Sequence, residues 1–176
     1  MCGVNGDSYG EYPSVLKLLK YDNVKLITFC PEDFSFGTPR EMCDIHGGTG
    51  LDVLEGRAKV LTETGIDWTE GMIKASEKML DVAREKQIEL AVMMDVSAAC
   101  GSQVIYEGNR YSENKKYQIG MGVCGAQLHR AGFKVISQRD FASLEILYSK
   151  IDSSHKVNAA AKDHDQHEWY IEYFKK

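Results

Sequence analysis

LAVMM, residues 90–94, is followed after two residues by SAACGS, residues 97–102, and this junction of an apolar run with a small-residue loop decides the fold. An apolar run of strand length that ends in loop-forming residues is typical of a parallel strand buried on both faces. Similar runs occur at residues 24–29, which lead into Cys30-Pro31-Glu32, and at residues 133–137. The sequence predicts buried strands at all three places.

Helical patterns alternate with these strands. Apolar residues recur at helical spacing in residues 69–86, 119–131, 141–151 and 164–174. Strands that alternate with amphipathic helices are typical of an α/β fold. We therefore predict a Rossmann-like or flavodoxin-like, doubly wound arrangement with a mainly parallel sheet and a C-terminal helical extension.

The chain is expected to form one domain with an added helical segment. Its 176 residues suffice for one well-buried core and are too few for two ordinary domains. The α/β domain is placed at residues 1–141 and the helical extension at residues 142–176. A short helix is predicted at residues 14–20, and residues 33–56, rich in Gly, Asp and Pro, are predicted to form a long loop.

Composition narrows the classes of function. The formal net charge of −5 does not indicate a nucleic-acid or anionic-membrane partner, although a tRNA partner stays open. No apolar run approaches the roughly 20 residues of a membrane helix, and residues 1–10 lack the cationic and apolar parts of a secretory signal. Five cysteines form a poor disulfide framework, so we expect a reducing, cytoplasmic location. The oligomeric state is left open.

Three cysteines lie where an α/β protein binds ligands. Cys30 follows the first predicted strand, Cys100 follows the central one, and Cys2 begins a third glycine-containing loop. Ligands of open α/β sheets bind beyond the carboxyl ends of the strands. Thiols from separate loops at one edge are candidates for a metal or cluster site, and small core cysteines are the alternative. The spacing alone leaves both interpretations open.

A longer ordered set of motifs resembles a known family. The chain contains seven motifs in a fixed order: CPE at residues 30–32, GTPRE at 37–41, GGTGLDVL at 47–54, SAACGS at 97–102, IYEG at 105–108, GV at 122–123 and FKVIS at 133–137. In order and spacing these are similar to the thiouracil-desulfurase family, long catalogued as domain of unknown function 523. The similarity covers about Cys2 to Phe141.

The resemblance implies a specific chemistry. It implies an enzyme with a [4Fe-4S] cluster held by Cys2, Cys30 and Cys100, which removes sulfur from a small thiocarbonyl substrate such as 2-thiouracil or 4-thiouridine and releases sulfide without net redox change. Glu32 would carry protons as the catalytic residue. The substrate-binding candidates are Arg40, Ser97 and Ser102. The position before the third cysteine, usually serine in the family, is Ala99 here.

Other interpretations stay open beside this one. The same three cysteines suit a non-catalytic protein that binds a small ligand or senses redox state. A scaffold that has lost its cluster is a third interpretation.

Arg40 has a structural alternative, an ion pair with Glu41 or Asp44. In the tail, the acidic and histidine residues at 163–168 suit a metal site less well than a solvated helix face. The aromatic residues at 169–174 are expected to pack on the body or on another subunit.

Overall fold

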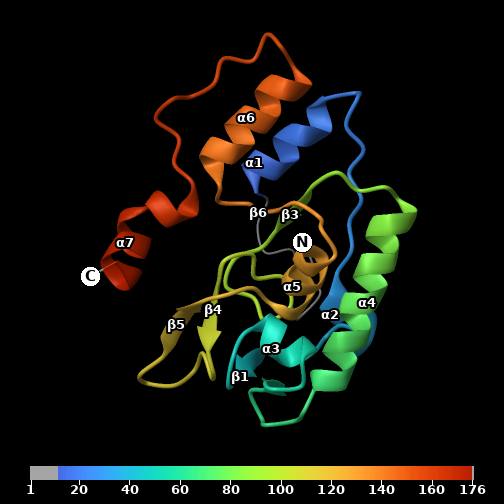
Figure 1. Ribbon diagram of the computed structural model, residues 1–176, viewed down its shortest axis with the longest axis vertical. Helices are drawn as coiled ribbons and strands as arrows, with labels where there is room; N and C mark the ends of the chain where they lie inside the picture. The colour runs from blue at the N-terminus through green and yellow to red at the C-terminus, as the bar shows by residue number, and fades with distance from the viewer. Residues whose placement is uncertain (1–11, 176) are drawn as a thin grey trace.

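The computed structural model describes residues 12–175 (Figure 1). Its helices, with two short 3-10 helices labelled η, are α1 (Pro13–Leu16), η1 (Lys17–Lys20), α2 (Pro31–Phe36), α3 (Gly50–Leu54), α4 (Thr69–Glu85), α5 (Val123–Arg130), α6 (Phe141–Ile151), η2 (His164–Gln166) and α7 (Glu168–Phe174). Its strands are β1 (Cys43–His46), β2 (Lys59–Thr62), β3 (Ala91–Met93), β4 (Val104–Glu107), β5 (Lys116–Ile119) and β6 (Val135–Ser137). Cys2 lies outside the described residues.

The strands pair two by two. β1 and β2 are antiparallel, β4 and β5 form an antiparallel hairpin, and β3 pairs in parallel with β6 so that Val92 lies opposite Ile136. The mixed α/β class is therefore confirmed. Within residues 12–175, the predicted mainly parallel, doubly wound sheet is seen only as the β3–β6 pair, and beyond that pair it stays a prediction.

Two stretches differ from the sequence-based expectation. Residues 24–29 were predicted to form a strand, yet they belong to no strand in the described chain. The long loop predicted at residues 33–56 contains most of α2, all of β1 and all of α3. Local signals explain the helices: Pro31 occupies the first position of α2, and Thr49 with Asp52 forms a capping box at α3.

The long helices agree closely with the periodicity. α4 (Thr69–Glu85) and α6 (Phe141–Ile151) lie where the apolar spacing predicted them. The predicted last helix is divided, because His167 has extended backbone angles between η2 and α7. Within residues 12–175, no helix is both long enough and apolar enough to cross a membrane.

Two apolar clusters hold the molecule together. The larger one joins α4, α5 and the strands, with Val53, Val60, Met72 and Val123 fully buried. Each such side chain contributes about 1.5–3 kcal/mol relative to an exposed one. A smaller cluster around Leu144 joins η1 to α6, which lie together at one end of the molecule, while β1 and α3 lie toward the other (Figure 1). The segments that carry Cys30 and Cys100 meet the larger cluster.

Candidate cysteine site

Cys30 lies at the start of a helix. It is the N-cap residue of α2, and its Sγ accepts a hydrogen bond from the backbone N–H of Asp33 at 3.4 Å. The Arg40 Nη2 atom lies 3.8 Å from the same sulfur. Backbone N–H groups at a helix start and a nearby guanidinium are contacts that stabilise a thiolate. Cys30 therefore has surroundings that suit a metal-binding sulfur.

Glu32 and Arg40 form an ion pair beside this sulfur. Arg40 Nε lies 3.1 Å from Glu32 Oε2, and the Arg40 side chain is only 2% exposed. Glu32 keeps 20% of its side chain exposed. The partners considered from the sequence for Arg40 were Glu41 and Asp44, and Asp44 is instead paired with Arg110 at 2.7 Å. The structure thus assigns Arg40 to Glu32, a carboxylate eight residues earlier.

Cys100 lies in a closed loop after β3. The Val96 N–H donates to the Val104 carbonyl at 3.0 Å and closes the loop, inside which the Cys100 N–H donates to Ser97 Oγ at 3.0 Å. Ser102 is 1% exposed, and its hydroxyl donates to Asp95 Oδ1 at 2.7 Å. Ser97 and Ser102, which were predicted to bind substrate, therefore make contacts that hold the loop.

The N-terminus of α5 packs directly against the backbone of this loop. A Cβ atom on Gly122, the N-cap of α5, would lie 2.5–2.7 Å from the carbonyl oxygens of Ser97, Ala98 and Ala99. The Val123 N–H donates to the Ala98 carbonyl at 2.8 Å. Only glycine permits this backbone contact, so residue 122 determines how closely α5 approaches the Cys100 loop.

The two cysteines share one electrostatic environment. Burial raises the pKa of the Cys100 thiol strongly, the charges of Glu32 and Cys30 raise it further, and Arg40 lowers it. These four groups therefore lie close enough to affect one another, although they come from two separate segments. A thiol whose pKa is raised in this way ionises when a metal replaces its proton.

The described residues include two of the three predicted cluster ligands, Cys30 and Cys100. No group of three or more His, Cys, Asp or Glu side chains in residues 12–175 is arranged to hold a metal ion. The four cysteines in that range form no disulfides among themselves. Cys30 and Cys100 nevertheless have the chemistry that an iron–sulfur group needs in its ligands, because they are thiols from separate segments with charged groups beside them. The third predicted ligand, Cys2, is outside the described residues.

Cys43 and Cys124 are core residues. Both are buried, at 4% and 0% exposed, and burial is the main cause that raises the pKa of each thiol. This agrees with the sequence-based assignment of Cys124 to the core. A cavity of about 480 Å³ between α1, α6 and the segment that follows α6 is lined by none of the predicted site residues.

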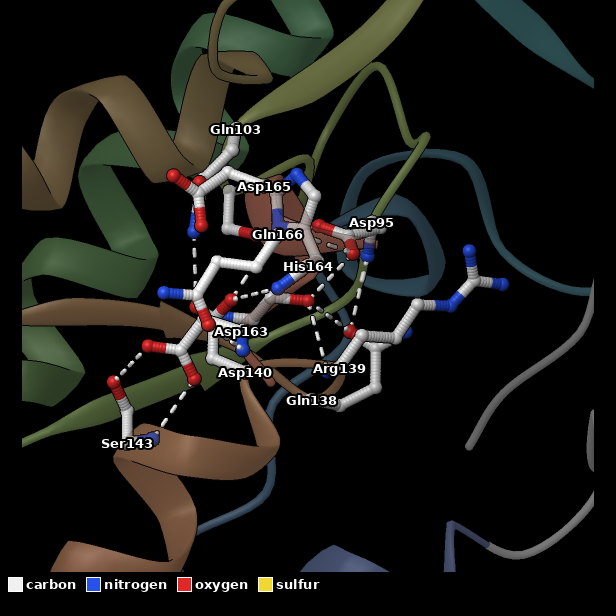
Figure 2. Close-up of polar contacts among 12 residues, drawn as sticks. Asp95, Gln103, Gln138, Arg139, Asp140, Ser143, Asp163, His164, Asp165 and Gln166 are labelled. Carbon is white, nitrogen blue, oxygen red and sulfur yellow. Dashed lines mark hydrogen bonds and ion pairs between the residues drawn. The ribbon is translucent and has the colours of Figure 1, made fainter. Parts of the chain in front are cut away.

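Sequence reasoning missed a buried polar network near the Cys100 loop. Asp95, Asp140 and His164 are 6%, 3% and 5% exposed, and they lie together in Figure 2. His164 was considered as part of a solvated helix face or a metal site, and it is neither. The available signal was weak: Asp95 directly follows the apolar run LAVMM, which ends at Met94.

The fold and the cysteine site define a mixed α/β protein with a thiol-containing site, and comparisons with known proteins give its family. The family model described as 2-thiouracil desulfurase matches residues 5–140, so the chain belongs to the 2-thiouracil desulfurase family. The uncharacterized protein YbbK of Bacillus subtilis (strain 168) is 39% identical over 140 residues, which cover 79% of this chain and 89% of YbbK. A solved structure of the [4Fe-4S]-dependent thiouracil desulfidase TudS is similar with a TM-score of 0.65 and 28% identity, over 84% of this chain and 89% of that one.

Proposed function

We propose that this protein is an iron–sulfur-dependent, non-redox desulfidase that removes sulfur from a thiolated pyrimidine of the 2-thiouracil or 4-thiouridine type. The observation that carries the proposal is the placement of two thiols on separate segments: Cys30 lies beside the Arg40–Glu32 ion pair, and Cys100 lies in the closed loop after β3. Membership of the 2-thiouracil desulfurase family and the similarity to TudS support it. A cytoplasmic location belongs to the same proposal, because thiolate ligands persist in a reducing compartment.

Cys2, Cys30 and Cys100 would hold the [4Fe-4S] cluster. Three cysteines leave one iron open, and when bound the cluster supplies a Lewis acid for the soft sulfur of a small thiocarbonyl compound. The Asp33 N–H and the Arg40 guanidinium hold the Cys30 sulfur in place. The closed loop and its contact with Gly122 hold Cys100.

Glu32 would carry protons in the reaction. The overall change replaces the thiocarbonyl sulfur with the oxygen of water, and the two protons of that water leave with the sulfur as hydrogen sulfide. Arg40 Nε lies 3.1 Å from Glu32 Oε2, so the orientation of the carboxylate is fixed while part of it stays exposed. A carboxylate that is positioned but accessible suits transfer of protons between water and the departing sulfur.

The remaining predicted residues would act through the protein rather than on the substrate. Arg40 is 2% exposed in its side chain, and we assign it to orienting Glu32 and Cys30. Ser97 holds the Cys100 backbone, and Ser102 ties the end of the loop to Asp95. Their influence on substrate binding would therefore follow from the shape of the loop.

Anaerobic reconstitution with iron and sulfide tests this function. Wild type should bind the cluster and release sulfide from 2-thiouracil or 4-thiouridine, whereas Cys30→Ser and Cys100→Ser should lose iron. Cys43→Ala is the matched control, because Cys43 is a buried cysteine without a proposed role. A full cluster without sulfide release would favour the binding or sensing alternative. Failure to bind iron would favour a scaffold without a cluster.

A further inference from the structure

The C-terminal extension inserts one buried histidine into the body of the protein. His164, in η2, is 5% exposed, and its Nδ1 atom lies 3.3 Å from Asp140 Oδ1 and 3.8 Å from Asp95 Oδ2 (Figure 2). The backbone N–H of His164 also donates to Asp140 Oδ1 at 3.1 Å. Its Nε2 atom has no hydrogen-bond partner among the residues that the structure describes. Among the described residues, the imidazole ring therefore makes its polar contacts through Nδ1.

Asp95 connects this histidine to the start of the Cys100 loop. Asp95 immediately precedes Val96, which closes the loop and has a positive φ of 55°. One carboxylate oxygen accepts from the Ser102 hydroxyl at 2.7 Å, and the other accepts from the Ser137 hydroxyl at 2.6 Å. Asp95 thus ties the end of the loop, through Ser102, to its beginning and to β6.

Asp140 connects the same histidine to the segment that follows the loop. Its Oδ2 atom accepts from Gln103 Nε2 at 2.9 Å and from the Ser137 N–H at 2.7 Å. Gln103 comes directly after Ser102, and its carbonyl accepts from the Gly120 N–H at 2.8 Å. The two carboxylates therefore hold both ends of the Cys100 loop. A single imidazole lies against both of them.

We propose that His164 is a positioning residue for the cysteine site, and that it fixes the Cys100 loop through Asp95 and Asp140. The inference rests on the proposed function for the role of Cys100 as a ligand. It extends the site to a residue beyond positions 5–140, where the family model ends. Two buried carboxylates are stabilised by a hydrogen-bond donor beside them, and its removal leaves them without that compensation. The loop between them would then open more often.

Alkylation of Cys100 in the full chain without a cluster tests the proposal. Under reducing, anaerobic conditions, iodoacetamide labelling followed by peptide mass spectrometry resolves Cys100 from Cys30. In His164→Leu the Cys100 labelling rate should rise by about tenfold, the change expected when a buried hydrogen bond to a charged group is lost. The Cys30 rate should change much less, because the Cys30 sulfur is held by the Asp33 N–H and by Arg40 rather than by the loop.

Two variants separate positioning from simple attachment of the extension. His164→Asn keeps a nitrogen donor near the position of Nδ1 and removes the unpartnered Nε2, so it should keep the Cys100 rate near that of wild type. Tyr173→Phe breaks a different attachment, in which the Tyr173 hydroxyl accepts from the Tyr117 N–H at 3.0 Å. This variant should leave Cys100 labelling unchanged.

The outcomes distinguish this inference from the proposed function. A wild-type Cys100 rate in His164→Leu overturns the inference, and so does an equal rise at Cys30, which would report general loosening. An Asn variant that labels as fast as the Leu variant also overturns it, because the donor at Nδ1 would then not matter. Absence of iron binding or sulfide release in wild type contradicts the proposed function alone, since labelling needs neither.

Discussion

At the scale of single residues, the pairing of Glu32 with Arg40 determines what the carboxylate can do. Arg40 Nε contacts one oxygen, Oε2, at 3.1 Å, and Arg40 Nη2 lies beside the Cys30 sulfur. One buried guanidinium therefore spans the proposed proton carrier and a proposed ligand. A lysine could not span both, because it carries its charge at a single point rather than on a planar fork.

Glu32→Gln should separate proton transfer from cluster binding. The carboxamide nearly matches the carboxylate in shape and its oxygen can still accept from Arg40, so the reconstituted variant should bind as much iron as wild type. The rate of sulfide release should fall by about a hundredfold or more, which is typical for loss of a positioned acid or base.

Glu41→Gln is the matched control for this variant. Glu41 lies in the same part of the chain, and its carboxylate accepts from the Thr64 hydroxyl at 2.7 Å, away from Cys30. It should keep wild-type activity. Equal turnover by Glu32→Gln and wild type would show that Glu32 is not the proton carrier.

At the scale of elements, the Cys100 loop depends on the N-terminus of α5. The first N–H groups of α5 donate to carbonyls of the loop, for example Cys124 N–H to Ala99 O at 2.9 Å. Helix N–H groups that lack partners within their own helix are satisfied in this way. The loop and α5 should therefore move together.

Gly122→Ala should disturb this contact. The new methyl group would meet three backbone carbonyl oxygens, which cannot move aside as a side chain can, so we expect a loss of about 1–3 kcal/mol in the free energy of unfolding. Urea unfolding measures this loss, and iron binding after reconstitution should fall with it. The comparison is with wild type, and equal free energies of unfolding would contradict the assigned backbone contact.

At the scale of the whole molecule, the C-terminal extension is attached by two kinds of contact. α7 packs aromatic rings on the hairpin, with Trp169 and Tyr173 edge-on to Tyr117 of β5 at 5.2 and 5.5 Å between ring centroids. Within the described residues, the aromatic rings of α7 therefore lie against the hairpin. The second attachment joins His164 to the carboxylates of Asp95 and Asp140, and it should depend on pH.

The pKa shifts at the ionic attachment have opposite directions. Burial lowers the pKa of His164, but the hydrogen bond to Asp140 and the charges of Asp95, Asp140 and Asp165 leave it above its ordinary value. Burial raises the pKa of Asp140, but hydrogen bonds from His164 and Ser137 leave it below its ordinary value. The Tyr170 ring of α7 also faces the imidazole, at 5.3 Å.

The attachment should therefore be strongest between about pH 4 and about pH 6.5, the unfolded-state values of Asp and His. The His164 contribution is complete below its unfolded pKa and is lost as pH rises through the raised folded pKa. The Asp140 contribution is complete above its unfolded pKa and is lost as pH falls through the lowered folded pKa.

Hydrogen exchange of residues 164–174 tests this pH dependence. After correction for intrinsic exchange rates, wild type should open more often at about pH 9 than at about pH 6. The difference should be absent in His164→Leu, which has no imidazole to titrate. Equal opening of wild type at both pH values would show that the charge of His164 does not hold the extension.

The sequence by itself determined the two longest helices and the family to which the chain belongs. The apolar spacing in residues 69–86 and 141–151 predicted α4 and α6 because a helix satisfies its backbone hydrogen bonds within a few residues. The motifs around Cys30 and Cys100 identified the family for the same reason, since they are local and ordered. Glycine-rich residues 33–56 misled the prediction, because composition does not reveal capping boxes or short strands.

Only the tertiary structure decided which distant strands pair and which distant side chains contact one another. The pairing of β3 with β6 and the burial of His164 against Asp95 depend on groups that are far apart along the chain. No local pattern encodes such contacts, because their free energy comes from desolvation and from charges that meet only after folding. His164 shows this most clearly. It is a polar residue in a charged tail, and it is buried because it contacts the carboxylates of Asp95 and Asp140, which follow β3 and β6.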